Sequence, residues 1–178
     1  MKLTKIEIEA LKKVLSNDFF NFAGDMIDKT TSDVLINLNQ RLNVDGNISM
    51  FIDGAADLNS KTAGIGGVIY TDNEELFTFS EYLHDSTNNE AEYTALIRGL
   101  EYLIEMKLLN VDIFSDSELV VKQISGEYKV KNPRMQLLHQ KASSLFSKFD
   151  EWSFSHVLRD KNKVADKLAG EGRSKGKK

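Results

Sequence analysis

The sequence predicts an α/β fold, with a mixed five-stranded sheet of three antiparallel and then two parallel strands, flanked by helices. Three strand-like segments follow one another between residues 47 and 84 with only short turns between them, which is typical of antiparallel neighbours. After residue 87, helical and strand segments alternate, which favours parallel pairing. The chain of 178 residues is long enough for one such domain and a small appendage.

Residues 1–45 predict two or three short helices before this sheet. Thr4 and Glu7 have the spacing of a capping box, and apolar residues then recur at helical intervals. A segment of this size rarely buries enough surface to fold alone, so we expect it to pack on the rest of the chain or on a second copy. The expected domains are therefore 1–45, helical, and 46–178, which ends in a basic tail.

The first three strands are expected where β-branched and aromatic residues gather. Their sequences are ISMFIDGAADL at 48–58, AGIGGVIYTD at 63–72 and ELFTFSEYLH at 75–84. The glycines of the second segment, Gly64, Gly66 and Gly67, lead into a strand and not into a helix. We therefore do not interpret them as a phosphate-binding loop.

The segment at 88–108 is the most regular predicted helix, because Leu96, Leu100 and Leu103 form an apolar stripe. The remaining elements are a buried-type strand at 111–116, helices at 117–126 and 133–149, a strand at 151–158 and a helix at 163–172. Pro133 suits the first turn of its helix. Right-handed crossovers place the fourth and fifth strands parallel to the first.

Composition excludes several classes of protein. The chain has no cysteine, so any metal must be held by oxygen or histidine ligands. No apolar run approaches membrane length, and the N-terminus lacks the apolar core of a signal peptide, so we expect a cytoplasmic protein without a membrane partner. The net charge of −4 does not favour a generally cationic nucleic-acid binder, so local charge must decide that question.

Four carboxylates are expected at one crevice. Asp53 and Asp116 end two neighbouring parallel strands, where α/β sheets place their ligands, and Gly54 removes side-chain bulk beside the first. Glu92 lies one turn before the apolar stripe and should face the sheet, and Asp166 lies in the first turn of the last helix. Alone, each has an ordinary explanation as a turn, cap or helix-dipole residue.

Clustered carboxylates repel one another unless cations neutralise them, and hard oxygen ligands suit Mg²⁺ or Mn²⁺. Two such ions about 4 Å apart can activate water for in-line attack on a phosphodiester. The expected cofactor is therefore two Mg²⁺ ions, with Mn²⁺ as the alternative.

Four motifs stand in order at these positions: FIDGAA, TNNEAEYTAL, SDSELVVKQISGEYKVKNP and NKVADKLA. Across residues 48–172 the chain thereby resembles the type 1 ribonuclease H family, in a short form without the basic protrusion. The resemblance implies an endoribonuclease that hydrolyses the RNA strand of RNA/DNA hybrids and leaves 5′-phosphate and 3′-hydroxyl ends. It also implies that Asp53, Glu92, Asp116 and Asp166 are the metal-binding and catalytic residues.

The resemblance implies substrate contacts as well. Asn88 and Asn89 would approach 2′-hydroxyls, Thr87 a DNA phosphate, and Ser117 the substrate beside Asp116. Gly54 is a further implied substrate contact, and Lys129 and Lys131 would provide the positive charge of the missing basic protrusion. Helix capping explains the residues at 87–89 equally well. Asp85 stands where some relatives have a phosphate-binding arginine, so we expect a weaker grip on the DNA strand.

Two residues compete for a further catalytic role. His156 precedes Asp166 by ten residues, as an assisting histidine does in several relatives, but it alternates with Trp152 and Phe154 on one face of the last strand. We therefore predict that His156 is packed in the strand, that Trp152 belongs to the core, and that Arg159 acts on the scissile or leaving phosphate.

Two other functions remain open on the sequence. A non-catalytic nucleic-acid-binding module would keep the fold without turnover, and another nuclease or phosphotransferase could share the fold with a different substrate. The motifs TNNEAE and NKVAD favour the hybrid-cutting alternative.

Overall fold

The computed structural model describes residues 10–11, 13–15, 27–32, 34–35 and 47–176, and it divides the chain into two units, Met1–Gly46 and Asn47–Lys178. In the first unit, residues 10–11, 13–14, 29–32 and 34–35 are helical. The capping box expected at Thr4 and Glu7 lies outside the described residues. In the part of the chain that the structure describes, no helix is both long and apolar enough to cross a membrane.

The second unit contains the predicted five-stranded sheet. Its strands are β1 (Ile48–Asp57), β2 (Thr62–Thr71), β3 (Glu74–His84), β4 (Asn110–Ser115) and β5 (Glu151–His156). Their order across the sheet is β3-β2-β1-β4-β5. The pairs β1–β2 and β2–β3 are antiparallel, whereas β1–β4 and β4–β5 are parallel, so the predicted topology is confirmed.

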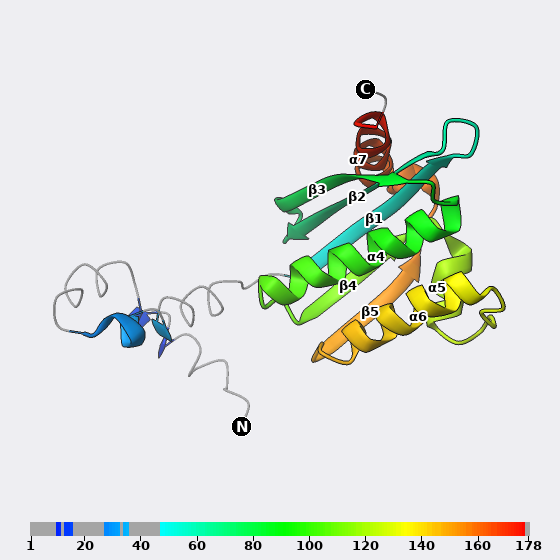
Figure 1. Ribbon diagram of the computed structural model, residues 1–178. Coiled ribbons are helices and arrows are strands. Elements are labelled where there is room, and N and C mark those ends of the chain that lie inside the picture. The colour runs from blue at the N-terminus through cyan, green and yellow to red at the C-terminus, as the bar shows by residue number, and fades with distance from the viewer. Residues whose placement is uncertain (1–9, 12, 16–26, 33, 36–46, 177–178) are drawn as a thin grey trace. The chain divides into compact units, whose positions relative to one another are not determined.

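Helices cover both faces of this sheet (Figure 1). They are α4 (Asn88–Glu105), α5 (Glu118–Ile124), α6 (Pro133–Phe146), the short 3₁₀ helix η1 (Arg159–Lys161) and α7 (Lys163–Ser174). The backbone of α4 contacts β1 at Gly54, whereas the backbone of α7 contacts β2 at Gly64 and Gly66. Because Gly54 pairs with Ile65, between those two glycines, α4 and α7 lie on opposite faces.

The core lies mainly between α4 and the sheet. Leu96, Leu100 and Leu103 are fully buried, as the predicted stripe requires, and they lie with Met50 and Ile52 of β1 among the most buried side chains. Burying each side chain of this size contributes about 1.5–3 kcal/mol relative to leaving it exposed. This packing fixes α4 against β1.

The prediction for Trp152 is wrong. Its side chain is 43% exposed, and its ring stacks on Phe146 of α6 with 4.0 Å between centroids. The physical reason is that β5 is the outermost strand on its side of the sheet, so one side of the indole remains in contact with solvent.

Gly64 and Gly66 serve helix packing, which agrees with our interpretation that they are no phosphate-binding loop. A Cβ on Gly66 would lie 2.3 Å from the backbone nitrogen of Ala169 in α7, and one on Gly64 would lie 2.1 Å from that of Arg173. No L-residue can occupy either position unless α7 moves. The glycines of β2 therefore set how closely α7 approaches the sheet.

We expect Gly66→Ala to lower the free energy of unfolding by about 1–3 kcal/mol, because the added methyl group would displace the α7 backbone. Gly170→Ala, in α7 itself, is the matched control. No atom lies within 4 Å of the Cβ that it adds, so it should stabilise the helix by about 0.5–1 kcal/mol. Urea unfolding of both variants measures the difference, and equal effects would contradict this account.

Candidate functional site

The site forms where the parallel pairing of β1 and β4 stops. The two strands pair from Ser49 with Asp112 to Ile52 with Ser115, and β4 then ends. Asp53 directly follows Ile52 and Asp116 directly follows Ser115, so the register places the two aspartates side by side. The prediction that Asp53 ends its strand is wrong, because β1 continues against β2 as far as Asp57. One edge of β1 is therefore open beside Asp53.

Glu92 reaches this edge from the other face of the sheet. Asp53 pairs with Gly66 and so belongs to the face that α7 covers, whereas Glu92 comes from α4. A Cβ on Gly54 would lie 2.3 Å from the Glu92 backbone nitrogen, so only glycine allows this contact. The space beside Gly54 thus admits a backbone, as the sequence suggested, and that backbone belongs to α4.

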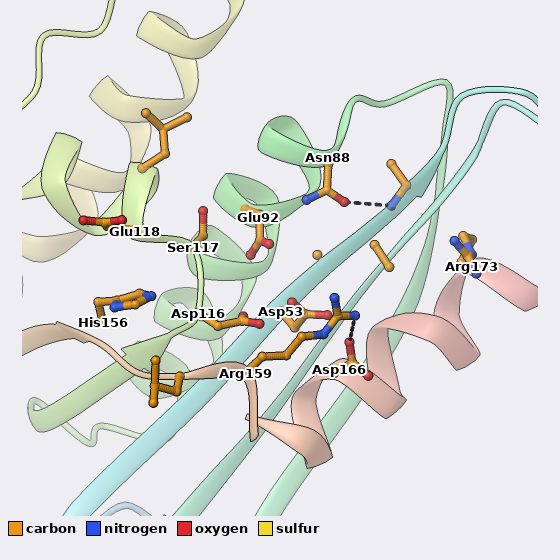
Figure 2. Close-up of a pocket in the computed structure, with 15 residues that line it drawn as sticks. Asp53, Asn88, Glu92, Asp116, Ser117, Glu118, His156, Arg159, Asp166 and Arg173 are labelled. Carbon is orange, nitrogen blue, oxygen red and sulfur yellow. Dashed lines mark hydrogen bonds and ion pairs between the residues drawn. The ribbon is translucent and has the colours of Figure 1, made fainter. Parts of the chain in front are cut away.

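Asp53, Glu92 and Asp116 converge, with one carboxylate oxygen from each residue within 4.8 Å of the others (Figure 2). Asp53 and Glu92 are each only 5% exposed. Burial, followed by the negative charges of Asp53 and Asp116, raises the pKa of Glu92 to about 9. Burial and the charges of Asp116 and Asp166 raise the pKa of Asp53 to about 7. The cluster is therefore strained electrostatically at neutral pH.

This donor set fits a hard divalent cation. The Oε2 atom of Glu92 is buried and has no hydrogen-bond partner among the residues that the structure describes, although burying an unpaired carboxylate oxygen is costly. A bound cation would satisfy this oxygen and offset the mutual repulsion of the three carboxylates.

Asn162 holds the two strand ends together, and the sequence analysis gave it no role. It is 1% exposed, and its Nδ2 donates hydrogen bonds of 2.9 Å to the Ile52 carbonyl oxygen and to Oδ1 of Asp116. The residue immediately precedes α7, where a cap would be expected, but its side chain makes no cap hydrogen bond. A polar residue directly before a helix usually indicates a cap, so the sequence signal at this position was misleading.

Asp166 lines the same pocket but stands apart from the group of three. Its Oδ1 accepts a hydrogen bond of 2.5 Å from Nη2 of Arg159 in η1. The pocket has a volume of about 590 Å³ and is lined by all four predicted carboxylates and by Arg159. The structure therefore brings the predicted acidic residues to one pocket, with Arg159 bound to the fourth.

His156 also lines this pocket, at the end of β5 (Figure 2). The prediction that it lies within the strand agrees with the structure, but the prediction that it is packed is wrong, because its side chain is exposed. The strand ends at the rim of the pocket, so its last side chain has no layer to pack against. Arg159 lies three residues later, at the start of η1, and also lines the pocket.

The predicted substrate-binding residues divide into two groups. Gly54, Asn88 and Ser117 line the pocket, and Oδ1 of Asn88 accepts a 3.2 Å hydrogen bond from the Ala56 backbone nitrogen. The other predicted contacts, Thr87, Asn89, Lys129 and Lys131, are exposed but do not line it.

Thr87 is engaged in capping, the alternative that the sequence left open. It forms a capping box with Glu90, whose carboxylate also pairs with Arg134 at 2.7 Å. Glu90 is therefore buried between two helix termini and takes no part in the carboxylate cluster. The pocket also includes Glu118, Leu119, Leu158 and Arg173, to which the sequence analysis assigned no role.

Comparison with known proteins agrees with this architecture. The profile of the Reverse transcriptase-like family matches residues 51–172. Ribonuclease HI of Halobacterium salinarum is 34% identical over 127 residues, which are 71% of this chain and 64% of that protein. A bifunctional protein of Mycobacterium tuberculosis is 36% identical over 121 residues, 67% of this chain and 33% of its own length. The chain thus spans less than two thirds of the length of these curated relatives.

Among solved structures, LC11-RNase H1 in complex with RNA/DNA hybrid is 38% identical, with a TM-score of 0.70. The match covers 74% of this chain and 100% of that one. The fold and the site thus define a ribonuclease H-like α/β domain. The chain belongs to the Reverse transcriptase-like family, and its 47–178 unit is a type 1 ribonuclease H domain, as the motifs predicted.

The raised pKa of Glu92 makes the stability of the metal-free protein depend on pH. Between its ordinary value of 4.5 and about 9, the folded chain holds a proton that the unfolded chain has lost. Stability should therefore fall as pH rises through this window. We expect Glu92→Gln to flatten this decline and to raise stability at pH 8.

Urea unfolding in chelator at pH 6 to 9 measures this effect. Glu171→Gln, which removes a half-exposed carboxylate of α7, is the control and should keep the slope of the unmodified chain. A decline that is equally steep in Glu92→Gln would contradict the assignment.

Proposed function

We propose that this domain is an endoribonuclease that hydrolyses the RNA strand of RNA/DNA hybrids and leaves 5′-phosphate and 3′-hydroxyl ends. The observation that carries the proposal is the convergence of Asp53, Glu92 and Asp116 within 4.8 Å at an open pocket. Buried like charges of this kind destabilise a fold, so a purely structural or binding role gives no reason for them. Membership of the type 1 ribonuclease H family supplies the substrate class.

The proposed cofactor is Mg²⁺, as two ions, with Mn²⁺ as an alternative. Asp53, Glu92, Asp116 and Asp166 would hold it, since all four line one pocket and Glu92 has a buried oxygen without a partner. When bound, such ions activate a water molecule and stabilise the leaving oxygen of an in-line displacement.

Residues of the chain would orient the hybrid. Because Oδ1 of Asn88 accepts the Ala56 N–H, its Nδ2 amide is the atom that can donate to a 2′-hydroxyl in the minor groove. Ser117, beside Asp116, would contact the strand that is cut. We propose weaker, positioning contacts for Thr87 and Asn89 near the start of α4 and for Lys129 and Lys131 between α5 and α6.

The catalytic carboxylates and Arg159 would act from different positions in the pocket. Asn162 donates to one oxygen of Asp116, which lines the pocket, and so helps to fix the orientation of this carboxylate. Arg159 is 78% exposed and forms an ion pair with Asp166, so its guanidinium has further donors that can bind the scissile or leaving phosphate.

For residues 1–45 we propose a helical appendage that packs on the nuclease domain or mediates self-association.

The proposal predicts cleavage of RNA in an RNA/DNA hybrid with Mg²⁺, and none in chelator. RNA duplex and DNA duplex should remain intact, because only the hybrid combines 2′-hydroxyls on one strand with a DNA partner. The measurement uses the full chain with three end-labelled substrates, each with Mg²⁺, Mn²⁺ or chelator. Equal cutting of the DNA duplex would contradict the substrate class.

Asp53→Asn and Asp116→Asn complete this test. Each should lower turnover by at least ~10³-fold, because stabilisation by a bound metal amounts to several kcal/mol and each 1.36 kcal/mol is tenfold in rate. Asp112→Asn is the matched control, since Asp112 lies in β4 and binds Ser153 at 2.6 Å outside the pocket. Hybrid binding without turnover in the unmodified chain would favour the non-catalytic alternative.

We expect Arg159→Ala to lower kcat by roughly 10- to 100-fold, the value of one hydrogen bond to a charged group. His156→Ala should cause a smaller loss, although the histidine lines the pocket. The two variants are compared at saturating hybrid, and melting curves of both show whether the fold is intact. A larger loss in the histidine variant would reverse the two assignments.

A further inference from the structure

Arg173 differs from the other arginines that the structure describes. Arg98, Arg134 and Arg159 form ion pairs with Glu81, Glu90 and Asp166 respectively. Within the described residues, no such pair involves Arg173, and its Nε atom is buried without a hydrogen-bond partner. An arginine remains charged at every physiological pH, so this side chain keeps an unmet demand for an anionic acceptor.

The nearby carboxylate, Asp57, does not meet this demand. Its Oδ1 accepts backbone hydrogen bonds from Asn59 at 3.0 Å and Ser60 at 3.4 Å. The hydrogen bond from Asn59 is the main reason that the pKa of Asp57 is lowered, and the charge of Arg173 contributes less. Asp57 is therefore occupied by its own turn.

The position of Arg173 relates it directly to the carboxylate cluster. It follows Asp166 by seven residues on α7, which is close to two helical turns, so both side chains lie on the same face about 10 Å apart along the axis. Both line the pocket, and Figure 2 shows them along the same helix.

The backbone that carries Arg173 is firmly placed. A Cβ on Gly64 of β2 would lie 2.1 Å from the Arg173 nitrogen, and one on Gly172 would lie 2.4 Å from the Glu81 carbonyl oxygen. This part of α7 thus touches β2 and β3 without intervening side chains. A cation on a fixed support loses less entropy when it binds a ligand than one on a loop.

We propose that Arg173 binds a backbone phosphate of the nucleic acid in the pocket. The planar guanidinium can donate two parallel hydrogen bonds to phosphate oxygens. Because Arg173 lies about 10 Å along α7 from Asp166, this phosphate is not the scissile one. Arg173 therefore controls affinity and register, and the chemical step depends on other residues. This inference rests on the proposed function.

The test uses Arg173→Ala, Arg173→Lys and, as a control, Lys175→Ala in the full chain. Lys175→Ala also removes one positive charge, at the C-cap of α7, but the Nζ atom of Lys175 donates to the Ser80 carbonyl oxygen at 2.5 Å, outside the pocket. Steady-state cleavage of RNA/DNA hybrid gives KM and kcat for each. Anisotropy with labelled hybrid gives Kd from 50 to 200 mM salt in an Asp53→Asn background.

Arg173→Ala should raise KM and Kd about tenfold, the effect of one charge-assisted hydrogen-bonded contact, and leave kcat nearly unchanged. The slope of log affinity against log salt should fall by about 0.9, one phosphate contact. Arg173→Lys should restore part of the affinity and the full salt slope, because lysine keeps the positive charge but lacks the planar guanidinium that donates two parallel hydrogen bonds. Lys175→Ala should match the unmodified chain.

An unchanged Kd and salt slope in Arg173→Ala would overturn this role while leaving the proposed function intact. A loss of melting temperature with equal falls in affinity and kcat would also overturn it, since that pattern indicates a structural role. If the unmodified chain binds no hybrid, both the role and the proposed function fail. Binding without cleavage would refute the proposed catalysis alone, because the Kd series still reports on Arg173.

Discussion

The different lengths of two paired strands make this site possible. Because β4 ends at Ser115 while β1 continues, an open edge remains where carboxylates from both faces of the sheet can meet. Asp53 comes from one face and Glu92 from the other, and only a glycine at position 54 lets the α4 backbone come close enough. Asn162 then ties the last paired residue of β1 to Asp116. A longer β4 would cover the edge and separate these groups.

The hydrophobic core stabilises an arrangement of buried carboxylates that electrostatic repulsion destabilises. The pKa values of Asp53 and Glu92 rise because burial and neighbouring charge disfavour their ionised forms, so the carboxylate cluster by itself reduces stability at neutral pH. The apolar stripe of α4 holds Glu92 in place despite this cost, since its leucines are fully buried against β1. A cation that neutralises the cluster, as proposed, should therefore also stabilise the fold.

The sequence predicted the fold well because periodicity is local and strong. The stripe of α4, the alternating strands and the crossover rule together specify the order of the sheet. It also predicted which acidic residues share a pocket, since they follow parallel strands or face the sheet. It did not predict the exposure of Trp152 and His156, because alternation reports a face of a strand but not whether that strand lies at the edge of the sheet or ends at a pocket.

The sequence also did not predict which side chains form hydrogen bonds and ion pairs with one another. The pair of Arg159 with Asp166 and the two hydrogen bonds of Asn162 depend on where η1 and α7 dock. The same holds for Arg173, whose Nε has no hydrogen-bond partner among the described residues. That docking is decided by Gly64 and Gly66, whose spacing in the sequence indicates only a strand with little side-chain bulk. Once α7 lies directly on β2, its residues 166 and 173 must both face the pocket, because seven residues bring a helix back to the same side. A glycine pattern in one strand thus determines which charged residues of a distant helix line the pocket.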